Sequence, residues 1–333
     1  WVLDRTTTPM GARRLREWLL APLVDGPGIG RRLDMVERLV EAVELRGALQ
    51  ETLDGMGDVE RLAGRIGARS ASPRDLGALA GALDRVARLH GLLADERVPG
   101  LAAVALALDA LPALADEIRR TLVDTPPPHT RLAGYVRPGR SPEVDELRAI
   151  SVDGKSWLAR FERDERQRTG ISSLKVRYNK VFGYYVEISK ANLGLVPADY
   201  DRKQTLVGAE RFITGALKEY EAKVLGAEER LRTLEAHLFA ALLETAAAHQ
   251  LTLVRIADGL ATLDALVALA DVAHRGSWVR PRIVAEPVVR IRAGRHPVVE
   301  AVAATPFVPN DATLDAAAEQ ILVITGPNMG GKS

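Results

Sequence analysis

The first third of the chain has apolar residues at helical spacing. Residues 8–122 are dense in Leu, Ala and Arg, and the apolar positions recur three or four residues apart. Pro9 behind a run of threonines, Asp58, and Ser72 ahead of Pro73 mark helix starts, because these side chains can accept hydrogen bonds from the free amides there. The pattern predicts a helical scaffold whose many arginines form a solvated face.

Two long helices are predicted after a proline-rich break. Residues 124–128 include three prolines and cannot be helical. Helical spacing resumes at Val144 and runs past Leu158, with an interruption expected near Gly154. It returns over about residues 209–250, where apolar residues repeat close to every 3.5 positions.

Between these helices the pattern changes to period two. Apolar residues alternate with polar ones over 174–179 and again over 184–188, which predicts a small hairpin. The order helix, hairpin, helix places this insert at the tip of an antiparallel two-helix arm. The insert has aromatic residues beside cations, and such residues could stack on nucleic-acid bases. Because they occupy alternating strand positions, a role in the small core of the hairpin is favoured. These aromatic residues are Tyr178, Phe182, Tyr184 and Tyr185.

Charge distinguishes the same insert from the rest of the chain. The whole sequence has 45 Lys and Arg against 44 Asp and Glu. Residues 155–214 alone carry twelve basic and seven acidic side chains, a local charge of +5 that leaves −4 for the remainder. One basic tip on a nearly neutral protein favours contact with a phosphate backbone, with merely solvated charge as the alternative.

Composition excludes several classes of protein. A chain of 333 residues suggests about two folded units. Its 47% hydrophobic and 27% charged residues exclude a disordered or collagen-like chain. Without cysteine it has neither disulfides nor Cys-ligated metal sites, which fits a reducing, intracellular setting. The sequence has no export signal and no uncharged run long enough to span a bilayer, so we expect no membrane contact.

The last residues carry the clearest chemical motif. From Trp278 onward short Val and Ile runs, including 283–284 and 288–291, predict strands of a new domain. The apolar run 321–325 predicts a strand buried on both faces, and it leads into the spacing G-x-x-x-x-G-K-S over residues 326–333. Glycines let backbone amides point at an anion, Lys332 supplies a cation for the β/γ-phosphates, and Ser333 can place its hydroxyl on Mg²⁺. Both termini look cut, so we expect a fragment.

Several stretches resemble the MutS family of DNA mismatch-repair ATPases, and together they cover essentially the whole chain in family order. The matching stretches are LDRTTTPMG (3–11) with Arg14, Leu15, Trp18 and Leu19; SLKV (173–176) with Tyr178, Asn179 and GYY (183–185); GRHPVVE (294–300); and GPNMGGKS (326–333). The last of these matches the family's phosphate loop letter for letter.

The resemblance implies a multidomain, mainly α fold. A helical core with the first lever helix would occupy residues 1–154, a small β-rich DNA clamp 155–214, and the returning lever helix with more core 215–277. Residues 278–333 would begin an α/β P-loop ATPase domain of the ABC type.

Site residues follow from the same resemblance. The ATP phosphates would be bound by Gly326, Pro327, Asn328, Met329, Gly330, Gly331, Lys332 and Ser333. Phe307 and Val308 would lie against the adenine, with a place in the core as the alternative for Phe307. Arg211 is the best candidate for a DNA phosphate, followed by Lys175, Lys180, Arg202 and Lys203. His296 is expected to be structural, and we assign no catalytic residue.

The function implied is a mismatched-DNA-binding ATPase that clamps duplex DNA with mismatches or small loops and uses ATP and Mg²⁺ to reach a sliding state. A homodimer, a downstream MutL-type repair factor and a bacterial, cytoplasmic, nucleoid-associated location are also implied. The family's mismatch-reading and connector modules are absent. The helix after the phosphate loop, the acidic Mg²⁺ partner and a residue that orients the attacking water are also missing, so we expect this chain alone to be inactive as an ATPase. The alternatives are a MutS paralogue in recombination, a P-loop nucleotide kinase with a helical lid, and a coiled-coil scaffold with a non-functional phosphate loop.

Overall fold

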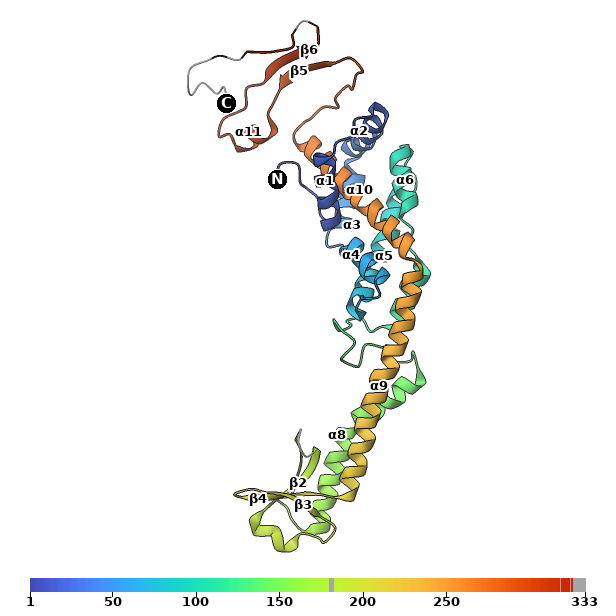
Figure 1. Cartoon of the computed structure of the whole chain (residues 1–333), viewed down its shortest axis with the longest axis vertical. Coiled ribbons are helices and arrows are strands. Elements are labelled where there is room, and N and C mark those ends of the chain that lie inside the picture. The colour runs from blue at the N-terminus through green and yellow to red at the C-terminus, as the bar shows by residue number, and fades with distance from the viewer. Residues whose placement is uncertain (180–182, 318, 324, 326–333) are drawn as a thin grey trace. The chain divides into compact units, whose positions relative to one another are not determined.

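A computed structural model describes residues 1–179, 183–317, 319–323 and 325, with the backbone alone over 151–156. Figure 1 shows the elements in chain order. The chain divides into two compact units. The first comprises Trp1–Gly64, Gly81–Pro112 and the described residues from His249 onward, and the second comprises Arg65–Ala80 and Ala113–Ala248.

The first unit is built around one central helix. Helix α10 (Gln250–Arg275) packs against α1 (Pro9–Leu20), α2 (Gly26–Glu41), α3 (Val43–Leu53) and α6 (Pro99–Ala107). The buried residues of α10 lie around most of the helix circumference, and many of them are small. At Gly259, for example, an added Cβ would lie 3.3 Å from both Ala107 and Leu108.

The predicted helix starts are confirmed. Thr8 caps α1 by accepting a hydrogen bond from the Gly11 amide at 3.0 Å. Asp58 precedes α4 (Val59–Gly67) and accepts from the Arg61 amide at 3.2 Å. Ser72 accepts from the Asp75 amide at the start of α5 (Pro73–Leu93), while Asp75 accepts from the Ser72 amide at 2.8 Å. These caps satisfy amides that a helix leaves unpaired at its first turn.

The last part of the first unit carries a small sheet. Strands β5 (Val288–Gly294) and β6 (Asn310–Asp315) pair antiparallel, and α11 (Pro297–Val302) lies between them in the sequence. The run 288–291 is therefore a strand as predicted, but Ile283 and Val284 lie in none. The prediction of a buried strand over 321–325 is wrong for the described residues, because Ile321, Leu322 and Val323 are exposed and outside any strand. A strand buried on both faces needs packed elements on each side. In this part of the chain the described residues form two strands and one short helix, and these leave residues 321–323 exposed.

The second unit contains a helix pair that carries a four-stranded antiparallel sheet at its end (Figure 1). After α7 (Pro112–Thr121), α8 (Pro142–Thr169) runs without a break through Gly154, so the expected interruption is wrong. The sheet comprises β1 (Lys175–Asn179), β2 (Gly183–Ser189), β3 (Asp201–Thr205) and β4 (Ala209–Ile213) in the order β1-β2-β4-β3, with a 3₁₀ helix, η1 (Lys190–Leu195), between β2 and β3. The returning helix, α9 (Gly215–Ala248), packs against α8.

The order helix, hairpin, helix is thus confirmed, but the insert holds four strands and the second helix begins later than predicted. Residues 209–213 pair with both β2 and β3 instead of starting the helix. Their side chains alternate in burial, and Thr214 caps α9 by accepting from the Leu217 amide at 3.2 Å. Tertiary pairing therefore outweighs the apparent helical spacing in this segment.

One face of the sheet packs on the helix pair. Val186, Ile188 and Phe212 join Ile171, Leu174 and Leu217 in an apolar cluster, against which Trp157, Leu158 and Phe161 of α8 pack. The start of β2 depends on Gly183, whose φ is +71° and whose added Cβ would lie 2.1 Å from Glu221 Oε1. A side chain at this position would meet both backbone strain and a clash.

Candidate nucleic-acid interface

The face of the sheet opposite the helix pair is polar. Because side chains alternate along a strand, the register Lys175↔Glu187, Arg177↔Tyr185 and Glu187↔Arg211 places these residues together, away from Val186 and Phe212. Gln204 of β3 lies opposite Arg211 on the same side. We call this set the outer face; it consists of Lys175, Arg177, Tyr185, Glu187, Gln204 and Arg211.

Arg211, the leading candidate for a DNA phosphate, is held inside this face. Its Nη1 donates to Gln204 Oε1 at 2.7 Å, and its guanidinium carbon lies 4.5 Å from the centre of the Tyr185 ring. Its Nε lies 3.5 Å from Glu187 Oε2 and makes no hydrogen bond with the described residues. Only 20% of the Arg211 side chain is exposed, so the sheet holds this cation in place and shields most of it.

The other candidates are more accessible. Lys175 and Lys203 are exposed, and Lys203 lies at the register shift between Arg202 and Gln204, where a bulge redirects the side chain. Arg202 is 63% exposed, but it lies 3.4 Å from Glu210 and opposite Phe212, on the helix-packed side of the sheet. Lys180 lies outside the described residues. The structure thus brings Lys175 and Arg211 onto one face and places Arg202 on the other.

Sequence reasoning did not single out Arg177 and Glu187 as site residues. Arg177 is 52% exposed and its Nε lies 3.8 Å from Glu187 Oε1. The period-two pattern could have placed Arg177 with Lys175. The position of Glu187 between Arg177 and Arg211 follows from strand register, which the sequence does not fix.

The aromatic residues of the insert divide between core and surface. Tyr184 packs against the apolar cluster, as the core interpretation predicted, whereas Tyr185 is buried beneath Arg211 on the outer face. Tyr178 differs, because it is 53% exposed with its ring 5.0 Å from that of Tyr184. Phe182 lies outside the described residues.

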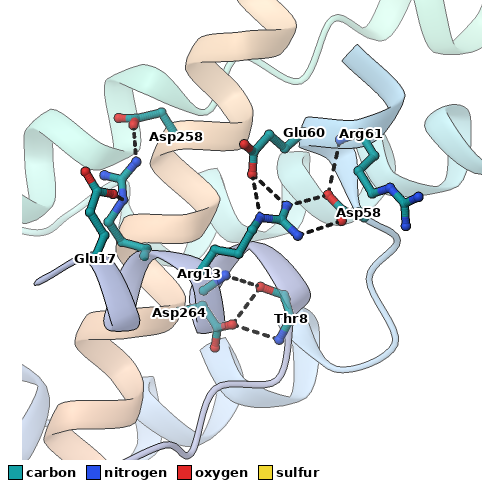
Figure 2. Close-up of polar contacts among 10 residues, drawn as sticks. Thr8, Arg13, Glu17, Asp58, Glu60, Arg61, Asp258 and Asp264 are labelled. Atoms are coloured by element: carbon teal, nitrogen blue, oxygen red, sulfur yellow. Dashed lines mark hydrogen bonds and ion pairs between the residues drawn. The ribbon is translucent and has the colours of Figure 1, made fainter. Parts of the chain in front are cut away.

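A second polar cluster surrounds the start of α1 in the first unit. Asp264 of α10 is 1% exposed and accepts hydrogen bonds from the amides of Thr7 at 3.0 Å and Thr8 at 2.8 Å. The Thr8 hydroxyl donates to the same carboxylate at 2.6 Å (Figure 2). The threonine motif therefore serves to anchor α1 on α10.

Arg13 and Arg14, which lie beside this anchor, each pair with two carboxylates. Arg13 donates to Asp58 at 2.9 Å and Glu60 at 2.6 Å, and these hydrogen bonds raise the pKa of its guanidinium (Figure 2). Burial would raise the pKa of Asp58, but hydrogen bonds from Arg13 and the Arg61 amide outweigh it and lower that pKa. Arg14 pairs in the same way with Asp258 at 2.5 Å and Glu17 at 3.2 Å. Arg13 and Arg14 are therefore both occupied by carboxylates.

The residues proposed for nucleotide contact are described only in part. Phe307 is half-buried and Val308 is exposed, in an extended segment that leads into β6. The Nδ1 atom of His296 accepts a hydrogen bond from the Val299 amide at 3.2 Å and caps α11, a structural role as expected. The phosphate-loop residues 326–333 lie outside the described residues.

Comparison with known proteins identifies the family to which the chain belongs. The family described as MutS domain III matches residues 1–270. The chain belongs to the MutS family, as the sequence motifs predicted. It is similar to proteins named DNA mismatch repair protein MutS from Salinibacter ruber (47% identical), Desulforamulus reducens (46%) and Anaeromyxobacter dehalogenans strain 2CP-C (48%). The match covers 100% of this chain in each case, but only 37%, 38% and 39% of these relatives respectively. In the part of the chain that the structure describes, no helix is both long and apolar enough to cross a bilayer.

Proposed function

We propose that this chain is the DNA-contacting and lever part of a DNA mismatch repair protein, and that its four-stranded sheet binds the phosphate backbone of duplex DNA. The observation that carries this proposal is the surplus of exposed cations on the sheet. Lys175, Arg177 and Lys203 are exposed. The carboxylates on the Arg211 side of the described sheet are Glu187 and Asp201, of which Asp201 pairs with Lys218 of α9. Contacts of this kind position a protein on DNA without reading its sequence.

The helix pair is suited to carry load from the sheet. Glu235 of α9 is fully buried and lies 3.0 Å from Arg148 of α8. The same carboxylate accepts a hydrogen bond from the Gly134 amide at 2.7 Å, in the segment that precedes α8. A buried carboxylate that joins three segments makes them move together, because separating them would leave a charge without partners. This supports the role of α8 and α9 as levers.

The finer parts of the function rest on the family and on the motif. We propose ATP and Mg²⁺ as ligands of residues 326–333, with Lys332 on the phosphates, Ser333 on the metal, and Phe307 and Val308 beside the adenine. ATP binding and hydrolysis would supply the free energy that converts a closed clamp into a sliding state. The intact protein would be a DNA-dependent ATPase in the bacterial cytoplasm, associated with the nucleoid. It would act as a homodimer on mismatches or small loops and recruit a MutL-type factor.

The division into core, clamp, returning lever and ATPase start, with limits at residues 154, 214 and 277, is part of the same proposal. The relatives are named as mismatch repair proteins, so neither a recombination paralogue nor a scaffold is favoured.

The experiment is a salt titration of DNA binding with charge reversals on the sheet. We expect Lys175→Glu with Lys203→Glu to weaken binding of the chain to a labelled duplex about tenfold or more at moderate salt, and to reduce the slope of log affinity against log salt by about 2. Fluorescence anisotropy measures both quantities. Heparin elution, in which each variant is compared with the unchanged chain, extends the measurement to weak binding.

The control is Arg88→Glu, an exposed cation of α5 in the first unit, where we expect little change. If the sheet variant and the control behave alike, the sheet does not bind DNA and the proposal fails.

A further inference from the structure

Glu187 occupies the centre of the outer face. It lies opposite Lys175 on β1 and opposite Arg211 on β4. Its two carboxylate oxygens face different cations, since Oε1 lies 3.8 Å from Arg177 Nε and Oε2 lies 3.5 Å from Arg211 Nε. Both distances exceed that of a normal hydrogen bond, so one carboxylate is shared loosely between two guanidinium groups.

We propose that Glu187 is an internal counter-charge: it competes with DNA phosphate for Arg177 and Arg211 and thereby weakens the binding of the sheet to DNA. This inference rests on the proposed function and adds a residue that opposes binding. A carboxylate and a phosphate offer guanidinium groups the same kind of acceptor, so the two compete for one set of donors.

The surroundings of Arg211 show why the competition is effective. The Glu187 side chain is 25% exposed and that of Arg211 20%, so water screens their attraction less than it screens a fully exposed pair. The Nε of Arg211 is buried and makes no hydrogen bond with the described residues, so its contact with Glu187 rests on charge attraction alone.

Arg211 does not need Glu187 to stay in place. Its hydrogen bond to Gln204 and its stacking over Tyr185 hold the guanidinium from two other directions. Removal of the Glu187 charge should therefore leave Arg211 in place and raise the positive potential of the face. A purely structural carboxylate would behave in the opposite way, because its loss would release the arginine and weaken binding.

The test is Glu187→Gln, which keeps the size of the side chain and removes its charge. We expect duplex DNA to bind about two- to fivefold more tightly, the range of a partly exposed ion pair, with a steeper dependence on salt. The matched control is Asp199→Asn, which changes the net charge equally. Asp199 is 59% exposed and pairs with Arg168 of α8, not with the outer face. Circular dichroism and thermal unfolding establish that each variant folds.

A double-mutant cycle identifies the route of the effect. In a chain that carries Arg177→Gln and Arg211→Gln, we expect Glu187→Gln to do no more than Asp199→Asn does. Weaker or unchanged binding of the single variant, or an equal gain in the doubly substituted background, overturns the inference. Neither result touches the proposed function, which fails if Lys175→Glu with Lys203→Glu changes DNA binding no more than Arg88→Glu does.

Discussion

Two groups of arginines in this chain differ in how their charge is balanced. Around α1, Arg13 and Arg14 each contact two carboxylates at 2.5–3.2 Å. On the sheet, one carboxylate serves Arg177 and Arg211 at 3.5–3.8 Å. In the first arrangement each arginine has close carboxylate partners, so the ion pairs stabilise the fold. The second leaves positive charge that is not closely paired, and this difference is the basis for proposing the sheet as a binding surface.

The central carboxylates of the two regions differ in the same way. Asp264 is buried and receives short hydrogen bonds from the backbone and hydroxyl of Thr8. Glu187 is a quarter exposed and has only distant partners. Removal of Asp264 should therefore be costly to the fold, whereas removal of the Glu187 charge should change binding.

The largest expected effect is that of Asp264→Ala. The substitution leaves the part-buried amide of Thr7 and the buried amide and hydroxyl of Thr8 without their acceptor, and we expect a loss of about 3 kcal/mol or more in the free energy of unfolding. Urea unfolding followed by circular dichroism measures it. The control is Asp258→Ala on the same helix, whose side chain is 64% exposed where it pairs with Arg14, and whose loss should cost at most about 1 kcal/mol. Similar losses for the two variants would contradict the distinction between a buried anchor and a surface pair.

Gly11→Ala should have the next largest effect. An added Cβ would lie 2.1 Å from Asp264 Oδ2, so α1 must shift away from α10. We expect a cost of about 1 to 3 kcal/mol by the same measurement, as for other overpacked sites. Gly30→Ala in α2 is the matched control, since an added Cβ meets nothing within 4 Å there. It should be neutral or stabilising because alanine favours the helix. A neutral Gly11→Ala would show that the close approach of α1 to Asp264 is not required.

Local signals in the sequence predicted local structure well. Thr8, Asp58 and Ser72 were identified as caps because a cap involves residues only two or three positions apart. The alternation over 174–179 and 184–188 predicted β1 and β2, which pair with each other and are close in sequence. In each case the interacting residues are close in sequence.

Features that depend on distant pairing could not be predicted in this way. Residues 209–213 read as the start of a helix, yet they form β4 between β2 and β3. The position of Glu187 opposite Arg211 depends on that same pairing, so their contact on the outer face could not be predicted from the sequence. Arg211 was predicted as the main phosphate contact, but the sequence could not show that Gln204 and Tyr185 hold it.

The smallest expected effect on stability is that of Lys175→Gln. Lys175 is exposed and has no ion pair among the described residues, so we expect the free energy of unfolding to change by less than about 0.5 kcal/mol. Lys218→Gln is the comparison, because Lys218 lies 3.0 Å from Asp201 and its loss removes a surface ion pair. In DNA binding the expected order is reversed, with Lys175→Gln lowering the salt slope by about 1 and Lys218→Gln lowering it less. If Lys175→Gln destabilised the fold and left the salt slope unchanged, Lys175 would have a structural role like that of Arg13 and Arg14. The contrast between the two regions would then not hold.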